Sequence, residues 1–269
     1  MSLAEEKVRA REQWRQDPCG AEYDREHQLG TREFFDSIAR HRYNEYAPWM
    51  PRVMEFEKFR GAKLLEVGCG MGTDLLQFAR NHARCVGIDL TPRSIEITRH
   101  RFKLYGADGA FMISDGEHLP FRDESFDVVY SNGVLHHTPD TAGAIREVHR
   151  VLRSGGMAKV MLYHRNSLNY WIEIVLRRGL LGAEFLRGRS PEEIMSRVIE
   201  HSDHGARPLV KVYSRRQARA LFSQFTDVKV EVEQLTRAEL RFLSPLVSES
   251  MLNSLRQTIG WNVIVTASK

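Results

Sequence analysis

Short apolar runs alternate with segments of helical periodicity along the middle of this chain of 269 residues. Seven runs have the length and composition of buried strands, and five of them fall within residues 62–163 with helical patterns between them. That alternation favours a parallel, doubly wound α/β sheet. The predicted strands are Lys63–Val67, Arg84–Ile88, Ala110–Ile113, Phe126–Tyr130, Ala158–Tyr163, Val228–Val232 and Trp261–Ala267.

Cap residues and breakers delimit the helices and divide the chain. Thr91 before Pro92 starts a helix, and Ser154–Gly156 indicates a helix stop and a turn. The helices predicted between the first strands are Thr73–Asn81, Pro92–Tyr105 and Thr141–Leu152. We expect four parts: a helical N-terminal lid segment (1–61), a cofactor-binding core (62–163), a helical insertion over the substrate site (164–212) and a C-terminal part that returns to the sheet (213–269).

The first predicted strand runs directly into a glycine-rich turn, in which every second residue from Gly68 to Gly72 is glycine. Glycine tolerates positive φ and lets a ligand approach the backbone, and the following helix N-terminus attracts anionic groups. Glu66 lies inside the first strand, and Asp89 ends the second, where an acid accepts ribose hydroxyls in dinucleotide folds. The pattern predicts a nucleotide-type cofactor site. The alternative is a structural turn beside a chance acid.

Composition is that of an ordinary globular protein, with 42% apolar and 28% charged residues. No run has the length of a membrane span, and a charged N-terminus argues against a signal peptide. Three scattered cysteines (Cys19, Cys69 and Cys85) are too few for a disulfide framework, so we expect a cytoplasmic protein. Between Arg177 and Arg219, ten Lys/Arg stand against five Asp/Glu. That excess suits phosphates, an acidic substrate or an anionic membrane surface, or is a solvated helical face.

Five stretches together resemble the class I S-adenosylmethionine-dependent methyltransferases, and most closely the small-molecule type that includes ubiquinone/menaquinone-biosynthesis enzymes. The resemblance implies a Rossmann-like sheet of seven strands with the last one antiparallel, and S-adenosylmethionine as cofactor. We expect a monomer or homodimer. The stretches are Leu65–Gly72, Gly87–Leu90, Asp115–Phe121, Phe126–Asp140 and Val151–Gly156.

The resemblance also assigns cofactor-binding positions. Glu66, Gly68, Cys69 and Gly70 form the loop that holds the methionine part, Asp89 resembles the ribose-binding acid, and Leu90 lies beside the adenine. Asp115 resembles the residue that the adenine amino group reaches, although it also suits an acid in a turn. The remaining positions are Gly116 and Glu117 next to it, and Ser131, Asn132 and Gly133, which follow the fourth strand and face the sulfonium end.

The acceptor side is predicted from chemistry at the strand ends. His137 and His136 are candidate bases if the acceptor must lose a proton, and His137 is preferred. A structural role for either histidine is the alternative. Tyr23, Tyr43 and Tyr46 are candidates for a lid that closes over the cofactor. Further candidate acceptor-pocket residues are Tyr163, His164, Asn169 and Tyr170.

His201, Asp203 and His204 have the side chains of a metal site, but without a further ligand a hydrogen-bonded loop is preferred, and this chemistry requires no metal. Three functions stay open: methyl transfer to a small molecule, methyl transfer to RNA or another macromolecule, and cofactor binding without catalysis. We favour the first. The insertion helix from Tyr170 is read as a substrate cover, with a membrane-surface helix as the competing interpretation.

Overall fold

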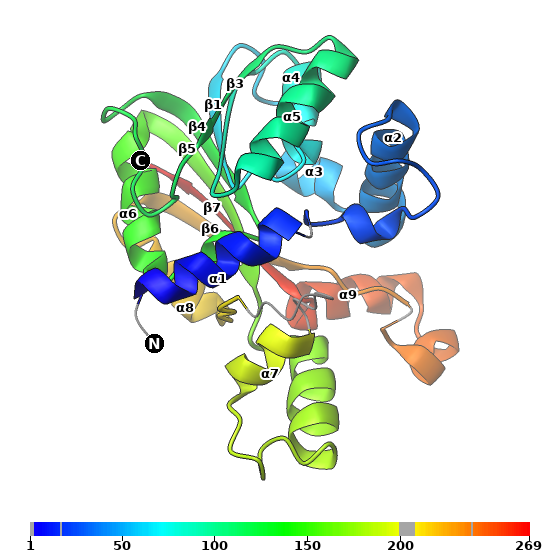
Figure 1. The fold of residues 1–269 in the computed structure, drawn as a ribbon. Coiled ribbons are helices and arrows are strands. Elements are labelled where there is room, and N and C mark those ends of the chain that lie inside the picture. Colours follow the sequence, from blue (N-terminus) through cyan, green and yellow to red (C-terminus); the bar gives the residue numbers. More distant parts are fainter. Residues whose placement is uncertain (1–2, 17, 199–207, 238) are drawn as a thin grey trace.

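The computed structural model describes residues 3–16, 18–198, 208–237 and 239–269 (Figure 1). One seven-stranded sheet runs through it in the order β3-β2-β1-β4-β5-β7-β6, and β7 lies antiparallel to both β5 and β6. The predicted α/β sheet with a reversed last strand is confirmed. The strands are β1 (Lys63–Val67), β2 (Arg84–Asp89), β3 (Gly109–Ile113), β4 (Phe126–Asn132), β5 (Leu152–Tyr163), β6 (Thr226–Glu233) and β7 (Asn262–Ser268).

Helices begin at the cap residues that the sequence offers. The Thr91 hydroxyl accepts a hydrogen bond from Ser94 N at 3.3 Å, and Ser214 forms a reciprocal capping box with Gln217. The α-helices are α1 (Leu3–Gln16), α2 (Arg32–Arg40), α3 (Met50–Met54), α4 (Thr73–Arg80), α5 (Pro92–Tyr105), α6 (Thr141–Val151), α7 (Pro191–Val198), α8 (Arg215–Leu221) and α9 (Glu249–Ile259). Short or wider helices are η1 (Ala21–Tyr23), η2 (His41–Tyr46), η3 (Leu135–His137), η4 (Tyr170–Leu181) and η5 (Arg241–Leu246).

The turn predicted at Ser154–Gly156 is wrong. Those residues lie inside β5, which pairs Leu152 with Phe126 and then, after an irregularity, Met157 with Val128. The residues between Leu152 and Met157 therefore form a local bulge, which interrupts the pairing with β4 without ending the strand.

The two faces of the sheet bury different helices. Leu65 and Val67 of β1 pack with α6 and α8, and Leu64, which points to the opposite face, packs with α3, α4 and α5. Because β1 is covered on both sides, its last four residues are buried. The central strands consequently present only their ends to a ligand.

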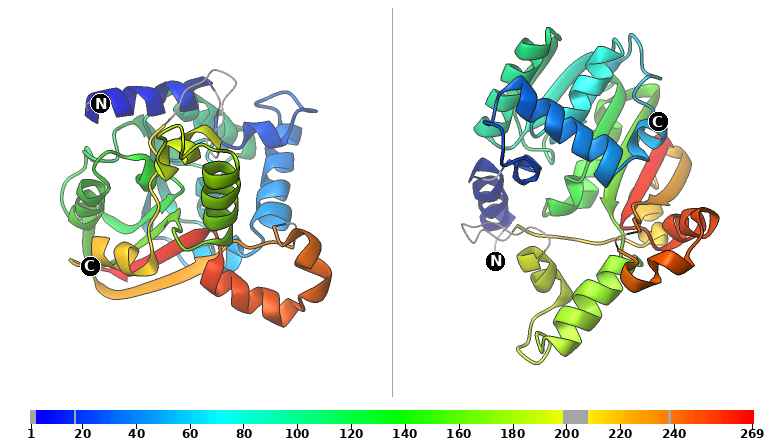
Figure 2. Two further views of the ribbon diagram at one scale, coloured as in Figure 1. Left: turned by 90° about the horizontal axis from the view of Figure 1, so that it is seen from below. Right: turned by 90° about the vertical axis from the view of Figure 1, so that its right-hand side faces the viewer.

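Two segments lie over the carboxyl ends of the strands. Helix α1 crosses beneath the sheet in Figure 1, and η4 with α7 projects further down from the end of β5. Figure 2 shows the same projection from the side. Within the described ranges, no helix combines the length and apolarity that crossing a bilayer would require.

Candidate cofactor and acceptor site

The glycine turn lies where the strand order reverses, between β1 and β4, which is the ligand-binding crevice of such sheets. Gly68 has φ +78°, and a Cβ there would lie 2.3 Å from Val134 Cγ2, so this position packs too closely for a side chain. Gly70 has φ +53°, but a Cβ there would meet nothing within 4 Å. The turn is therefore tightly packed at Gly68 and open to a ligand at Gly70.

Asp89 ties the glycine turn to the end of β2. Its Oδ2 accepts from Gly70 N at 3.0 Å, and its Oδ1 accepts from Thr91 N and Thr91 Oγ1, both at 2.9 Å. Burial raises the pKa of Asp89, although these hydrogen bonds oppose the effect. A carboxylate offers about four acceptor positions, so Oδ2 retains capacity for a hydroxyl beside Leu90.

Glu66, one residue before the end of β1, is buried with one oxygen unused. The side chain is buried, and Oε2 has no hydrogen-bond partner within the described ranges. Burial and then the nearby Asp74 carboxylate raise the pKa of Glu66 well above its usual range. A buried acid in this condition is suited to an incoming ammonium group, which would supply the missing partner and stabilise the ionised form.

Beside Glu66, Asp74 is the centre of a polar network that the sequence did not indicate. Arg42 binds its two oxygens through Nε and Nη2, each at 2.7 Å, and the Tyr43 and Tyr130 hydroxyls donate at 2.7 and 2.8 Å. Burial works against ionisation, but Arg42 and the hydroxyls hold the pKa of Asp74 below its usual range. The predicted lid residue Tyr43 thus anchors the N-terminal segment to α4.

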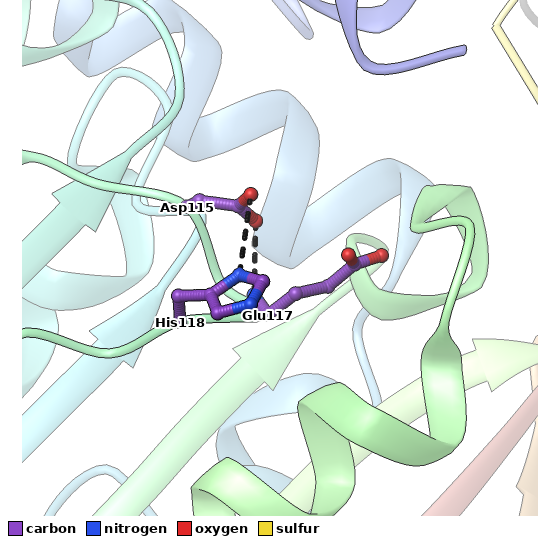
Figure 3. A group of neighbouring side chains, drawn as sticks. All are labelled: Asp115, Glu117 and His118. Carbon is purple, nitrogen blue, oxygen red and sulfur yellow. Dashed lines mark hydrogen bonds and ion pairs between the residues drawn. The ribbon is translucent and has the colours of Figure 1, made fainter. Parts of the chain in front are cut away.

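The turn after β3 carries Asp115, Glu117 and His118 (Figure 3). Lys7 of α1 lies on both carboxylates, with Nζ 2.6 Å from Asp115 Oδ2 and 2.5 Å from Glu117 Oε2. Side-chain oxygens and nitrogen of the three residues lie within 4.8 Å of one another, a spacing compatible with a cation, and the Lys7 ammonium is positioned there. Asp115, which is expected to bind the adenine amino group, therefore also holds α1 in place through Lys7.

The end of β4 and Gly133 after it form the floor of the crevice; Ser131 and Asn132, expected to follow the strand, are its last two residues. Ser131 donates to Val67 O at 2.9 Å, and Gly133 N donates to Met161 O at 3.3 Å. Asn132 Oδ1 is buried and has no hydrogen-bond partner among the residues described. A Cβ at Gly116 would lie 3.0 Å from Val67 Cγ1, so the adenine-side turn packs directly on β1.

Next to this floor, the rings of Trp14, His137, His136 and Tyr163 pack in a row at tilted or edge-on angles, an arrangement called here the ring stack. His136 is fully buried between His137 and Tyr163, with ring centroids 4.1 and 3.9 Å away. Neither ring nitrogen of His136 has a hydrogen-bond partner in the part of the chain that the structure describes. Burial, with a contribution from His137, lowers the pKa of His136 well below its usual range, so the ring is neutral.

His137 differs from its neighbour in being oriented by the backbone. Its Nδ1 lies 2.7 Å from Leu209 O, and a carbonyl can only accept, so Nδ1 carries the proton. In the neutral ring Nε2 then holds the lone pair. Trp14 of α1 meets the His137 ring edge-on, with centroids 5.7 Å apart, so the same helix that carries Lys7 also covers the histidine pair.

The other predicted substrate residues do not all gather here. Tyr163 lies in the ring stack and also packs on Trp261, and Tyr170 belongs to the small core beneath the insertion. His164 is buried with Nδ1 2.9 Å from Gly260 O, and Asn169 directly precedes η4. Tyr23 and Tyr46 form a separate group with His41. The residues His201, Asp203 and His204 lie outside the described residues.

Taken together, the fold and crevice define a nucleotide-cofactor-binding protein with a reversed seventh strand. Residues 65–160 match the family model described as a methyltransferase domain. Phthiotriol/phenolphthiotriol dimycocerosates methyltransferase 1 of Mycobacterium ulcerans is 35% identical over 185 residues, which are 67% of this chain and 64% of the relative. Ubiquinone biosynthesis O-methyltransferase of Methylocella silvestris is 31% identical over 159 residues, 58% of each chain. These matches span less than two thirds of either relative's length.

A solved S-adenosylmethionine-dependent methyltransferase from Methanosarcina mazei has the same fold, with a TM-score of 0.58 at 18% identity over 81% of this chain and 97% of its own. The chain belongs to the class I S-adenosylmethionine-dependent methyltransferases. The crevice fits that family's cofactor, because an open glycine turn, a buried acid with an unpartnered oxygen and a strand-end acid converge at one place.

Proposed function

We propose that this protein transfers a methyl group from S-adenosylmethionine to a small-molecule acceptor bound against the ring stack of Trp14, His137, His136 and Tyr163. The observation that carries the proposal is the position of that stack. It adjoins the end of β4, next to the cofactor crevice. Helix α1 covers it through Trp14 and is held in place by the contact of Lys7 with Asp115. A covered aromatic site suits a small, largely apolar molecule better than a polymer.

Within the crevice, each assigned residue has a physical task. Glu66 is suited to an ammonium group, the Gly68–Gly70 turn to close backbone approach, and Asp89 to a ribose hydroxyl. Asp115, with Gly116 and Glu117, lies at the adenine end. Asn132 offers its unpartnered oxygen at the opposite end, flanked by Ser131 and Gly133.

S-adenosylmethionine supplies a sulfonium-bound methyl group that is electrophilic without further activation. The protein therefore chiefly has to align an acceptor atom, and alignment alone contributes about 7–11 kcal/mol to such reactions. Where the acceptor atom carries a proton, Nε2 of His137 is the proposed base, because the Nδ1–H···O=C bond to Leu209 fixes its lone pair. His136, neutral and stacked, serves as an apolar wall.

The names of the two relatives reported above refer to small molecules, which supports a small acceptor. Methyl transfer to RNA or another macromolecule, and cofactor binding without catalysis, are the alternatives. The structure adds no observation that favours either.

The test begins with thermal unfolding in the presence of S-adenosylmethionine, S-adenosylhomocysteine or NADH. A ligand at 100 times its dissociation constant stabilises the fold by about 2.7 kcal/mol, so we expect a higher Tm with the first two ligands only. A shift with NADH alone would remove the methyltransferase proposal. Acceptor-dependent formation of S-adenosylhomocysteine from a panel of apolar phenols, alcohols and amines then tests transfer. Binding without turnover on any acceptor would favour a non-catalytic role.

A further inference from the structure

The insertion arm, defined here as residues 170–189, leaves the core as a projection beyond the strand ends. It comprises η4 and the turn that follows, and Figure 1 and the right-hand view of Figure 2 show it extending away from the sheet. One side of η4 is anchored, because Tyr170 and Ile174 are buried against Met195, Val210 and Trp261. The arm is therefore a fixed structural element whose other side faces outward.

That outward side is unusually apolar. Thirteen large hydrophobic side chains are exposed within the described residues, and six of them lie between positions 171 and 186. Single exposed apolar residues are ordinary, but a contiguous apolar patch marks an interaction surface. The six are Trp171 (52% exposed), Ile172 (42%), Leu176 (41%), Leu180 (58%), Leu181 (76%) and Leu186 (89%).

The spacing of these residues makes one continuous strip. The helix closes with a bond from Gly182 N to Arg177 O, and in a helix of this wider type residues four to five apart share a row. Ile172, Leu176 and Leu180 fall on that row. Leu181 and Leu186 continue it around the tip. The strip lies opposite the buried residues Tyr170 and Ile174, so η4 is apolar on two sides and only one of them is covered.

Arginines flank the strip and leave it with a positive charge. Glu173 is shared by Arg177 and Arg178, and Glu184 is shared by Arg187 and Arg189. Each carboxylate thus neutralises one of its two arginines, and the arm keeps a net charge of +2 from four arginines and two glutamates. Such a strip repels a second copy of itself and attracts an anionic surface.

We propose that the insertion arm docks on the surface of a lipid bilayer that carries anionic headgroups. Leucine and isoleucine would enter the boundary between headgroups and acyl chains, Trp171 would lie at headgroup level, and the arginines would contact lipid phosphates. The arm is long enough to lie in the interface. Its root packs on Trp261, which in turn packs on Tyr163 of the ring stack, so docking would bring the proposed acceptor site close to the bilayer.

The test is co-sedimentation of the full chain with vesicles of phosphatidylcholine alone or of phosphatidylcholine mixed with phosphatidylglycerol. We expect binding to the mixed vesicles at least about tenfold stronger than to neutral ones, since each net basic charge near an anionic surface contributes about 1 kcal/mol. Raising the salt concentration should weaken that binding. No cofactor is added, so the outcome does not depend on the proposed methyl transfer.

Three variants distinguish binding through the insertion arm from non-specific adsorption of the protein to vesicles. The double variant Leu180→Asp/Leu181→Asp and the single variant Leu186→Asp change exposed side chains, so both should fold with an unchanged Tm and lose vesicle binding. Leu246→Asp, 76% exposed on η5, is the matched control and should bind as the wild type does. Wild-type protein that does not sediment with anionic vesicles would overturn the proposal. So would arm variants that bind normally, or a wild-type dimer that the double variant converts to monomer.

Discussion

The cofactor crevice and the acceptor stack lie side by side but are built in opposite ways. In the crevice, acids are held by the chain itself: Asp74 accepts four hydrogen bonds and Asp89 accepts three. In the stack, His136 is completely buried and both ring nitrogens lack hydrogen-bond partners among the described residues. Polar networks fix a geometry in advance, whereas stacked rings provide shape and exclude water. The first arrangement suits a constant cofactor and the second suits an apolar acceptor.

The largest effect should come from breaking the network on the crevice side. Asp74→Asn leaves the partly exposed Arg42 against a neutral amide at a buried position, and the loss should reach up to about 3–5 kcal/mol, the cost of removing one partner of a fully buried ion pair. Chemical denaturation should show that loss. The control Asp36→Asn also removes a charged acceptor, from the Tyr105 hydroxyl, but at an exposed position, and it should cost under about 1 kcal/mol. Equal losses in both variants would mean that the network does not hold the crevice together.

Variants of His137 and His136 should show which histidine takes part in catalysis and which only packs. His137→Phe keeps a ring against Trp14 but removes Nε2, so turnover of an acceptor that must lose a proton should fall about 100-fold or more, with unchanged affinity for S-adenosylmethionine. His136→Phe should retain most of the turnover. Single-turnover rates and calorimetry measure both quantities. A larger loss of turnover in His136→Phe would assign the base to the other ring.

On the cofactor side, Asp89→Ala should weaken S-adenosylmethionine binding by about 10- to 100-fold. The variant loses a hydroxyl contact to a charged acceptor, worth about 1.5–3 kcal/mol, and frees Gly70 N from its anchor. The control Asp108→Ala removes the same charge next to the amino end of β3, which is the end away from the cofactor site. This variant should bind the cofactor normally. Unchanged calorimetric affinity in Asp89→Ala would exclude Asp89 from the site.

The smallest effect concerns pH. Burial lowers the folded-state pKa of His136, so below about pH 6.5 the unfolded chain binds a proton that the folded chain does not. This histidine therefore costs stability as the pH falls through the ordinary histidine range. In His136→Phe the decline in Tm between neutral and mildly acidic pH should be shallower than in the wild type. The decline should not vanish, because burial also lowers the pKa of His164.

The sequence predicted what local patterns encode. Each of the seven strands, the helix start at Thr91 and the glycine turn follow from residues close together in the chain. Lys7 and Arg42 were missed because their partners, Asp115 and Asp74, are 108 and 32 residues away, and a single charged residue on a helix gives no signal of its partner. The turn predicted at Ser154–Gly156 was wrong because contacts with the end of the chain hold these residues within β5. They have no partner on β4, but Gly155 N donates to Lys269 O and Lys269 N donates to Gly156 O, both at 2.9 Å.

If S-adenosylmethionine enters the open space at Gly70, a side chain there should weaken its binding, and one titration tests this directly. Gly70→Ala and Gly61→Ala each place a methyl group at positive φ (+53° and +75°) with nothing within 4 Å, so both carry a similar backbone strain of about 1–2 kcal/mol. Only Gly70 lies beside Asp89. Calorimetric titration with S-adenosylmethionine should give affinities for wild type and Gly61→Ala that agree within about twofold, and an affinity at least about tenfold weaker for Gly70→Ala. Equal affinities in the two variants would contradict the account and place the cofactor elsewhere.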